Sequence, residues 1–264
     1  MIPGLFNSDG FIQFEEERHL YNDIESNPYE SVSRVLKTLK QPFDKKGISR
    51  MMAQRVAAET GGDVLVEQNK LLSEWDDKRI TASDHGNRIH GALESYLKTG
   101  NIGDRIIMPV LGKLLRITDP KRCYRYFPEA IIYAQKYRIA GTSDLVIQRQ
   151  RSKNSPFDFY DYKTNLSRGI VFHSMKKKDG DIRHYNRYLL PPLEHLEDSN
   201  YAIYSLQLSI YAFMAQLTWG IRVGRLGIIF INKQGQPKIY PVPYMKMEAQ
   251  AVLEHFIKRK ELPK

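Results

Sequence analysis

Apolar residues recur along the chain at two spacings, and each spacing predicts one kind of element. Spacings of three and four residues are typical of helices with a buried face, and they occur over residues 31–39, 48–60, 63–76, 80–99, 200–219 and 247–260. Short apolar or alternating runs predict strands over residues 130–133, 139–148, 157–163, 223–232 and 238–242. Residues 1–30 suit a short strand or extended arm, and residues 105–115 suit a strand or a short helix. This order predicts an α/β fold with a mixed central sheet flanked by helices.

Two of the predicted strands lie on either side of residues 149–156, a polar and basic segment that ends in proline. This arrangement is typical of a hairpin with a long loop. Side chains alternate between the faces of a strand, so Asp161 and Lys163 share a face and Tyr162 points the other way. Pairing of the two strands would bring Asp144 beside Asp161. Two close carboxylates raise each other's pKa unless a cation lies between them, and such oxygen ligands suit Mg²⁺ or Mn²⁺.

The predicted helix over residues 80–99 carries a candidate metal ligand. Ser83 is its expected N-cap, and His90 and Glu94 lie on one face because they are four residues apart. A histidine alone on a helix is more often a hydrogen-bonded residue than a ligand, and His85 is expected to face solvent or to cap the helix. The acidic hairpin that follows in the sequence favours the ligand role for His90.

Composition and charge narrow the classes of partner. The chain has 264 residues, of which 42% are hydrophobic, and a formal net charge of +10. A basic excess favours a polyanionic partner, nucleic acid first and an anionic membrane second. The single cysteine, Cys123, excludes a disulfide within the chain and fits a reducing, intracellular compartment. No apolar run approaches the roughly 20 residues of a membrane span, and the early acids at the N-terminus do not fit a secretory signal.

A long segment between the predicted hairpin and the helix over residues 200–219 has no clear period. It contains basic residues, among them Lys176, Lys177 and Lys178, with interleaved tyrosines. Such a segment can follow a nucleic-acid backbone and stack on bases. A solvated, flexible loop explains the same composition equally well, and both interpretations stay open.

The acidic hairpin resembles that of the PD-(D/E)XK nuclease superfamily. The resemblance rests on Gly141-Thr142-Ser143-Asp144 followed by Asp161-Tyr162-Lys163-Thr164, and it is greatest for the RecB-type branch, which includes phage and mitochondrial exonucleases. Ser143 stands where proline gives the superfamily its name. Two further spacings agree in order: Gly86 with His90 before the hairpin, and Gln207 with Tyr211 after it. Because the chain has one cysteine, the resemblance is to members without an iron–sulfur cluster.

The resemblance implies a metal centre with four ligands and a catalytic lysine. His90, Asp144 and Asp161, with the backbone carbonyl of Tyr162, would hold Mg²⁺ or Mn²⁺. A metal lowers the pKa of bound water and polarises a phosphate. Lys163 would orient or deprotonate the attacking water and stabilise the charged phosphate.

Further residues receive roles from the same resemblance. Glu129 precedes the hairpin and would contact metal-bound water, although a surface acid at the start of a strand is nearly as good an explanation. Gln207 and Tyr211 would face the groove and contact DNA or the surroundings of the catalytic lysine. Lys176, Lys177 and Lys178 are the candidate backbone contacts.

These expectations combine into one functional hypothesis. Residues 1–79 would form a mainly helical N-terminal part packed on a nuclease core of residues 80–264. The protein would be a metal-dependent DNA exonuclease in replication, repair or recombination, with possible partner proteins of those pathways, in the cytoplasm of a bacterial or phage-infected host. Two alternatives remain: a DNA-binding accessory module with weak or no catalysis, and an endonuclease of the same fold.

Overall fold

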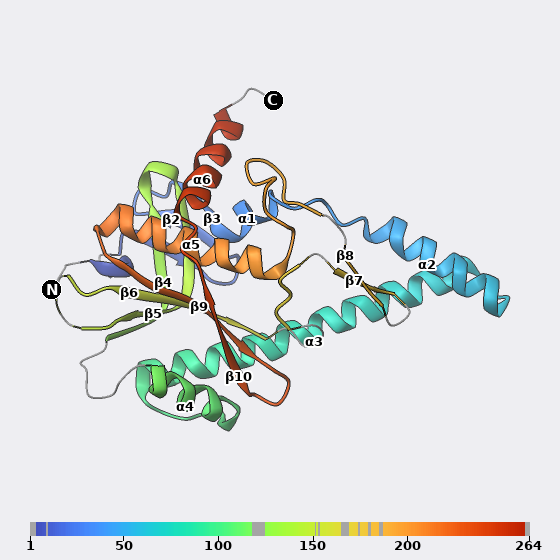
Figure 1. The fold of residues 1–264 in the computed structure, drawn as a ribbon, viewed down its shortest axis with the longest axis horizontal. Coiled ribbons are helices and arrows are strands. Elements are labelled where there is room, and N and C mark those ends of the chain that lie inside the picture. The colour runs from blue at the N-terminus through green and yellow to red at the C-terminus, as the bar shows by residue number, and fades with distance from the viewer. Residues whose placement is uncertain are drawn as a thin grey trace.

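A computed structural model of the protein describes residues 4–8, 10–117, 125–150, 152, 154–164, 169–173, 175–178, 181–184 and 187–261. Its centre is a mixed eight-stranded sheet in the order β1-β2-β3-β5-β6-β9-β10, with β4 on the other edge of β5 (Figure 1). The strands of this sheet are β1 (Ile12–Glu15), β2 (Leu20–Asp23), β3 (Pro28–Ser31), β4 (Arg125–Ala134), β5 (Ile139–Gln148), β6 (Phe157–Lys163), β9 (Val223–Ile231) and β10 (Pro237–Val242). A separate hairpin consists of β7 (Met175–Lys178) and β8 (Asp181–His184).

Helices cover both faces of the sheet. They are α1 (Val32–Lys37), α2 (Lys45–Thr60), α3 (Val64–Thr99), α4 (Met108–Ile117), α5 (Asn200–Trp219) and α6 (Lys246–Glu261), with 3-10 turns at Leu5–Asn7, Arg105–Ile107 and Gln135–Tyr137. α5 packs with Phe157 and Phe159 in one core, whereas α3 and α4 pack with Tyr160 and Tyr162 in another. Because side chains alternate between the two faces of β6, this strand contributes residues to both cores. The predicted mixed sheet flanked by helices is confirmed.

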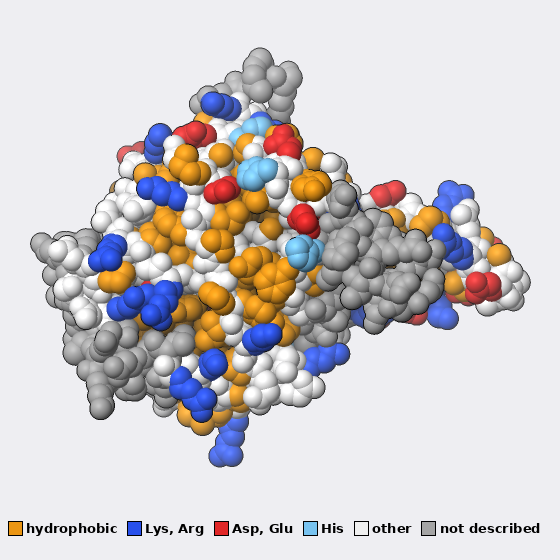
Figure 2. Space-filling model, viewed as in Figure 1, with side chains coloured by type: hydrophobic (Ala, Val, Ile, Leu, Met, Phe, Trp, Pro, Cys, Tyr) orange, Lys and Arg blue, Asp and Glu red, His pale blue; other side chains and the backbone are white. Residues whose placement is uncertain are grey.

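The helix α5 is buried on most of its surface, which explains its strongly apolar sequence. The hydroxyl of Ser199 accepts a hydrogen bond from the N–H of Ala202 at its start, and Gly220 ends it in a left-handed conformation. In the view of Figure 2, hydrophobic side chains gather across the middle of the molecule, and Lys and Arg side chains stand in separate groups toward its margins.

The helix α3 corrects the sequence analysis. Two helices were expected, with Ser83 as the N-cap of the second, but one helix of 36 residues runs from Val64 to Thr99. Its length is about 54 Å at 1.5 Å per residue. No glycine or proline lies between Asp76 and Ser83, so nothing in that stretch ends the helix. The first half packs against α2 as a projecting arm (Figure 1), so the expected division after residue 79 falls inside a continuous helix.

Three smaller expectations also change. The extended N-terminal arm is three strands, and β3 pairs in parallel with the start of β5. The helix expected from residue 48 begins at Lys45, so Gly47 lies in the first turn of α2, where Asp44 accepts its N–H. The ambiguous segment 105–115 is helical. No described helix has the length and apolar content that crossing a membrane requires.

Candidate metal and catalytic site

The site lies where β5 changes partners along one edge. Residues 139 and 140 pair with β3, and residues 145–148 pair with β6, so residues 141–144 lie between the two partners. β6 diverges from β5 here, and the backbone N–H of Tyr162 donates to Oδ2 of Asp144 at 2.6 Å. This bond holds the Asp144 side chain in the gap between the strands.

Glu129 faces this gap from β4. It lies opposite Asp144 in the register, between the pairs Pro128–Leu145 and Ala130–Ser143. Its φ of 47° is left-handed, which is rare for a residue with a side chain and costs about 1 to 3 kcal/mol. Backbone strain of this kind inside a strand often marks a functional position.

The helix α3 brings His90 to the same place. Its Nδ1 lies 3.6 Å from Oδ1 of Asp144, and its ring meets the ring of Tyr162 edge-on at 5.5 Å. The buried side chains of Ile89 and Leu93 hold this part of α3 on the sheet. A Cβ on Gly86 would lie 3.0 Å from Oγ1 of Thr164, so a larger residue would press α3 away from the end of β6.

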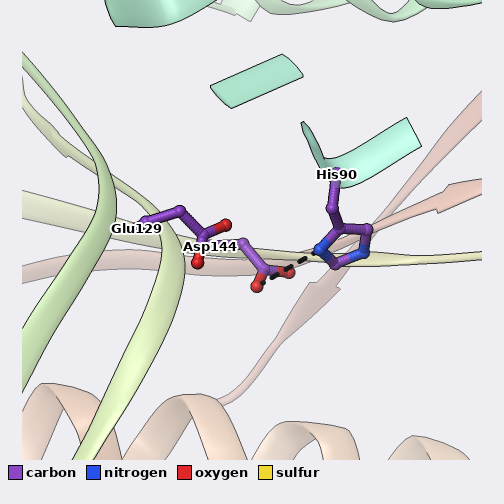
Figure 3. A group of neighbouring side chains, drawn as sticks. All are labelled: His90, Glu129 and Asp144. Carbon is purple, nitrogen blue, oxygen red and sulfur yellow. Dashed lines mark ion pairs between the residues drawn. The ribbon is translucent and has the colours of Figure 1, made fainter. Parts of the chain in front are cut away.

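Together, His90, Glu129 and Asp144 form a candidate metal group. One ligand atom from each lies within 4.8 Å of the others, and Figure 3 shows the three side chains converging from α3, β4 and β5. An imidazole nitrogen with two carboxylates is a donor set that divalent metals accept. These residues fit a divalent cation because it would relieve the electrostatic repulsion between the carboxylates of Glu129 and Asp144. Glu129 thus belongs with the candidate ligands, where sequence reasoning had placed it only beside metal-bound water.

Asp161 and Lys163 form a buried ion pair next to this group. Their side chains are 3% and 20% exposed, and the lysine Nζ also lies 4.7 Å from the ring centre of Tyr204. The expected shared face of these two residues is confirmed. In the structure the Asp161 carboxylate is directed at the lysine, although the family resemblance implies a place for it among the metal ligands.

Electrostatics in the site favour protons on the acids when no metal is bound. Burial, with repulsion from Asp144, raises the pKa of Glu129 to about 8. Burial and repulsion from Asp161 raise the pKa of Asp144 to about 6, although His90 and Lys163 oppose this. Burial alone would lower the pKa of Lys163, but Asp161 and Asp144 outweigh it and raise that pKa, so the lysine is a cation at neutral pH.

A groove of about 670 Å³ opens over these residues. Its floor contains Glu129, Lys163 and Thr164, one wall is α3, and the other is the β1–β2 hairpin. The volume lies within the range of about 300 to 1,000 Å³ that is typical of ligand sites. His90 and Lys163 both line it, so substrate in the groove can reach the metal group and the ion pair together.

Gln207 and Tyr211 lie at a second, smaller hollow of about 150 Å³, which shares His19 and Thr142 with the groove. The Gln207 amide donates to the Tyr211 hydroxyl at 3.4 Å, and Tyr211 is buried against Gly141. The backbone of Lys176–Lys178 forms β7, but the side chains of Lys176, Lys177 and Lys178 lie outside the described part of the structure.

Comparisons with known proteins add little to this geometry. Neither family models nor curated proteins match the chain. Among solved structures, the chain is similar to the crystal structure of SSO0001, with a TM-score of 0.32 and 14% sequence identity over 88% of this chain and 85% of that one. A likeness at this level carries no argument about function. The functional conclusion therefore rests on the site.

Proposed function

We propose that the protein is a metal-dependent nuclease of the PD-(D/E)XK type that hydrolyses DNA from an end. One observation carries the proposal: the group of His90, Glu129 and Asp144 lies beside the Asp161–Lys163 ion pair, and each of the two contributes side chains to one groove, His90 and Glu129 from the first and Lys163 from the second. A cluster of buried acids with a lysine in an open groove suits a substrate that is an anion and brings a cation with it.

Different residues of the site would have different roles in phosphodiester hydrolysis. His90, Glu129 and Asp144 would hold Mg²⁺ or Mn²⁺, with Asp161 and the Tyr162 carbonyl as further candidate ligands. A bound divalent cation supplies an acidified water and charge stabilisation at the phosphate. Lys163, held as a cation by Asp161 and Asp144, would stabilise the charge that develops on the phosphate oxygens.

The Asp161 carboxylate has a positioning role in this scheme. It fixes the lysine Nζ, which therefore approaches a phosphate without losing conformational entropy at the moment of reaction. The Tyr162 N–H, which donates to Asp144, leaves the other carboxylate oxygen directed at His90. These contacts preorganise the group before substrate arrives.

The test is incubation with DNA labelled at its 5′ or 3′ end, single- or double-stranded, with Mg²⁺, Mn²⁺ or EDTA. We expect metal-dependent shortening from one end, absent in Lys163→Met. Circular DNA of the same sequence should stay intact, and its cleavage would make the protein an endonuclease. Tight DNA binding without cleavage in any metal would contradict the proposal and favour an accessory binding module.

A further inference from the structure

The β1–β2 hairpin forms the groove wall opposite α3, and no step of the proposed chemistry uses it. Phe14, Glu16 and His19 line the groove from this side. The turn is closed by a hydrogen bond from the N–H of His19 to the carbonyl of Glu16 at 3.1 Å. Because the hairpin lines the same groove as His90 and Glu129, a substrate on the floor would lie between it and α3.

Three rings pack together into a platform on this hairpin. The rings of Phe14 and Tyr21 stack at 4.5 Å and 21°, and His19 meets both edge-on, at 5.3 Å and 5.6 Å. His19 is exposed and has a left-handed φ of 51°, a conformation that costs energy for a residue of this type. Because the rings brace one another, their position over the groove costs little further entropy on binding.

The platform is joined to the strand that carries the metal group. The hydroxyls of Tyr21 and Thr142 lie 3.0 Å apart and share a hydrogen bond. Thr142 itself lines the groove and is two residues from Asp144. The distance between the rings and the reacting centre is therefore set by the fold rather than by a flexible loop.

The charge of the hairpin decides which part of a nucleic acid it suits. Glu15, Glu16 and Glu17 follow one another at the turn, with Arg18 as the adjoining base, in a chain whose net charge is +10. Carboxylates repel phosphates, so the sugar–phosphate backbone is disfavoured on this side. Aromatic rings attract nucleobases of any sequence by stacking.

We propose that the β1–β2 hairpin is the base-side wall of the groove: an unpaired nucleobase packs on the platform, stacked on one of the perpendicular rings of Phe14 and His19 and edge-on to the other, while the strand's phosphates run along the floor by Lys163. The inference rests on the proposed nuclease function and names its substrate class, a single strand or a frayed end. A duplex carries a second backbone, which would meet the three glutamates of the turn.

The test measures the affinity of the full-length protein for short single-stranded oligonucleotides in Ca²⁺, with one abasic residue moved stepwise from the end. For the wild type, affinity should fall about tenfold when the abasic residue reaches the platform, the loss expected for one stacked base. His19→Ala and Phe14→Leu should bind the intact strand more weakly by a similar factor, and the abasic residue should cost them nothing more.

Two comparisons complete the design. Phe43→Ala removes an aromatic side chain that is 64% exposed just before the α2–α3 arm, and it should keep the wild-type response. Replacing Glu15, Glu16 and Glu17 together with glutamine should raise duplex affinity relative to single-strand affinity. Because His19 is exposed, His19→Ala decides the matter even where Phe14→Leu unfolds.

The possible results distinguish a failure of the base-side wall from a failure of the proposed nuclease function. A wild type that cleaves DNA but binds abasic and intact strands equally well at every position overturns the base-side wall and leaves the nuclease standing. An abasic effect that disappears in His19→Ala, in a protein that never cleaves, supports the wall and overturns the nuclease.

Discussion

The backbone N–H of Tyr162 donates a 2.6 Å hydrogen bond to Oδ2 of Asp144, at the point where β5 and β6 separate. The other oxygen of the same carboxylate lies 3.6 Å from Nδ1 of His90. One side chain thus spans the opening between two strands and meets a helix from the opposite face of the sheet. The separation of β5 and β6 thus provides the place for the candidate metal group.

The Asp161–Lys163 pair should contribute to both stability and activity, and the two contributions can be measured separately. Removing one member of a buried pair leaves a charge without its partner, so Asp161→Asn or Lys163→Met should each lower the free energy of unfolding by about 3 kcal/mol. Each should also reduce single-turnover DNA cleavage at least about 100-fold. Urea unfolding and cleavage of end-labelled single strands measure the two effects.

The double variant Asp161→Asn/Lys163→Met is the matched control for this pair. It leaves no unpaired charge, so we expect most of the lost stability to return while cleavage stays absent. Recovery of cleavage in the double variant would contradict a catalytic role for Lys163.

The stability of the metal-free protein should fall as pH rises. In the folded protein the pKa of Glu129 is raised from 4.5 to about 8, and that of Asp144 from 3.8 to about 6. Raised values mean that the folded state binds more protons, so their contribution is present below about pH 4 and is lost as pH rises toward 8. Thermal unfolding in EDTA between pH 5 and 8 measures this slope.

Glu129→Gln supplies the control for the pH effect. It resembles the protonated wild type, so in EDTA its Tm should change less with pH and exceed the wild-type Tm at pH 8. In Mn²⁺ the order should reverse, because the metal binds the ionised carboxylate of the wild type. A wild-type Tm that stays constant from pH 5 to 8 in EDTA would show that these acids do not carry raised pKa values.

His90 should matter for metal binding and His85 should not. Both lie on α3, but only His90 belongs to the group with Glu129 and Asp144. His90→Asn should shift the Mn²⁺ concentration needed for a given rise in Tm upward by at least about tenfold, equivalent to about 1.4 kcal/mol. His85→Asn should leave the titration unchanged, and an equal shift in both variants would argue for a general effect on α3.

Gly141 should be intolerant of a side chain because of packing. A Cβ there would lie 2.8 Å from the ring of Tyr211 and 3.1 Å from Val32. Gly141→Ala should lower the free energy of unfolding by about 1 to 3 kcal/mol, as overpacking of a core does. Gly112 in α4 has open space around the same position, so Gly112→Ala should stabilise by up to about 1 kcal/mol through helix propensity. Chemical denaturation of both variants checks the contrast.

Local patterns were sufficient for the elements nearest the chemistry. The ranges 139–148, 157–163 and 200–219, read from alternation and apolar spacing, coincide with β5, β6 and α5. These elements have strong local signals, with two-residue alternation in one case and a strongly apolar helix in another. Where the signal was weak, as between residues 76 and 83, the expected break in α3 was wrong because nothing in the sequence ends the helix there.

By itself, the sequence determined β5, β6, β9 and β10, the helix α5 and the candidate acids, because short-range spacing and residue chemistry suffice for these. Only the tertiary structure decided that Glu129 joins His90 and Asp144, that Asp161 is directed at Lys163, and that the β1–β2 hairpin faces α3 across the groove. These contacts join segments that are far apart in the chain. They depend on strand divergence, a left-handed backbone at Glu129 and helix packing, none of which leaves a periodic trace in the sequence.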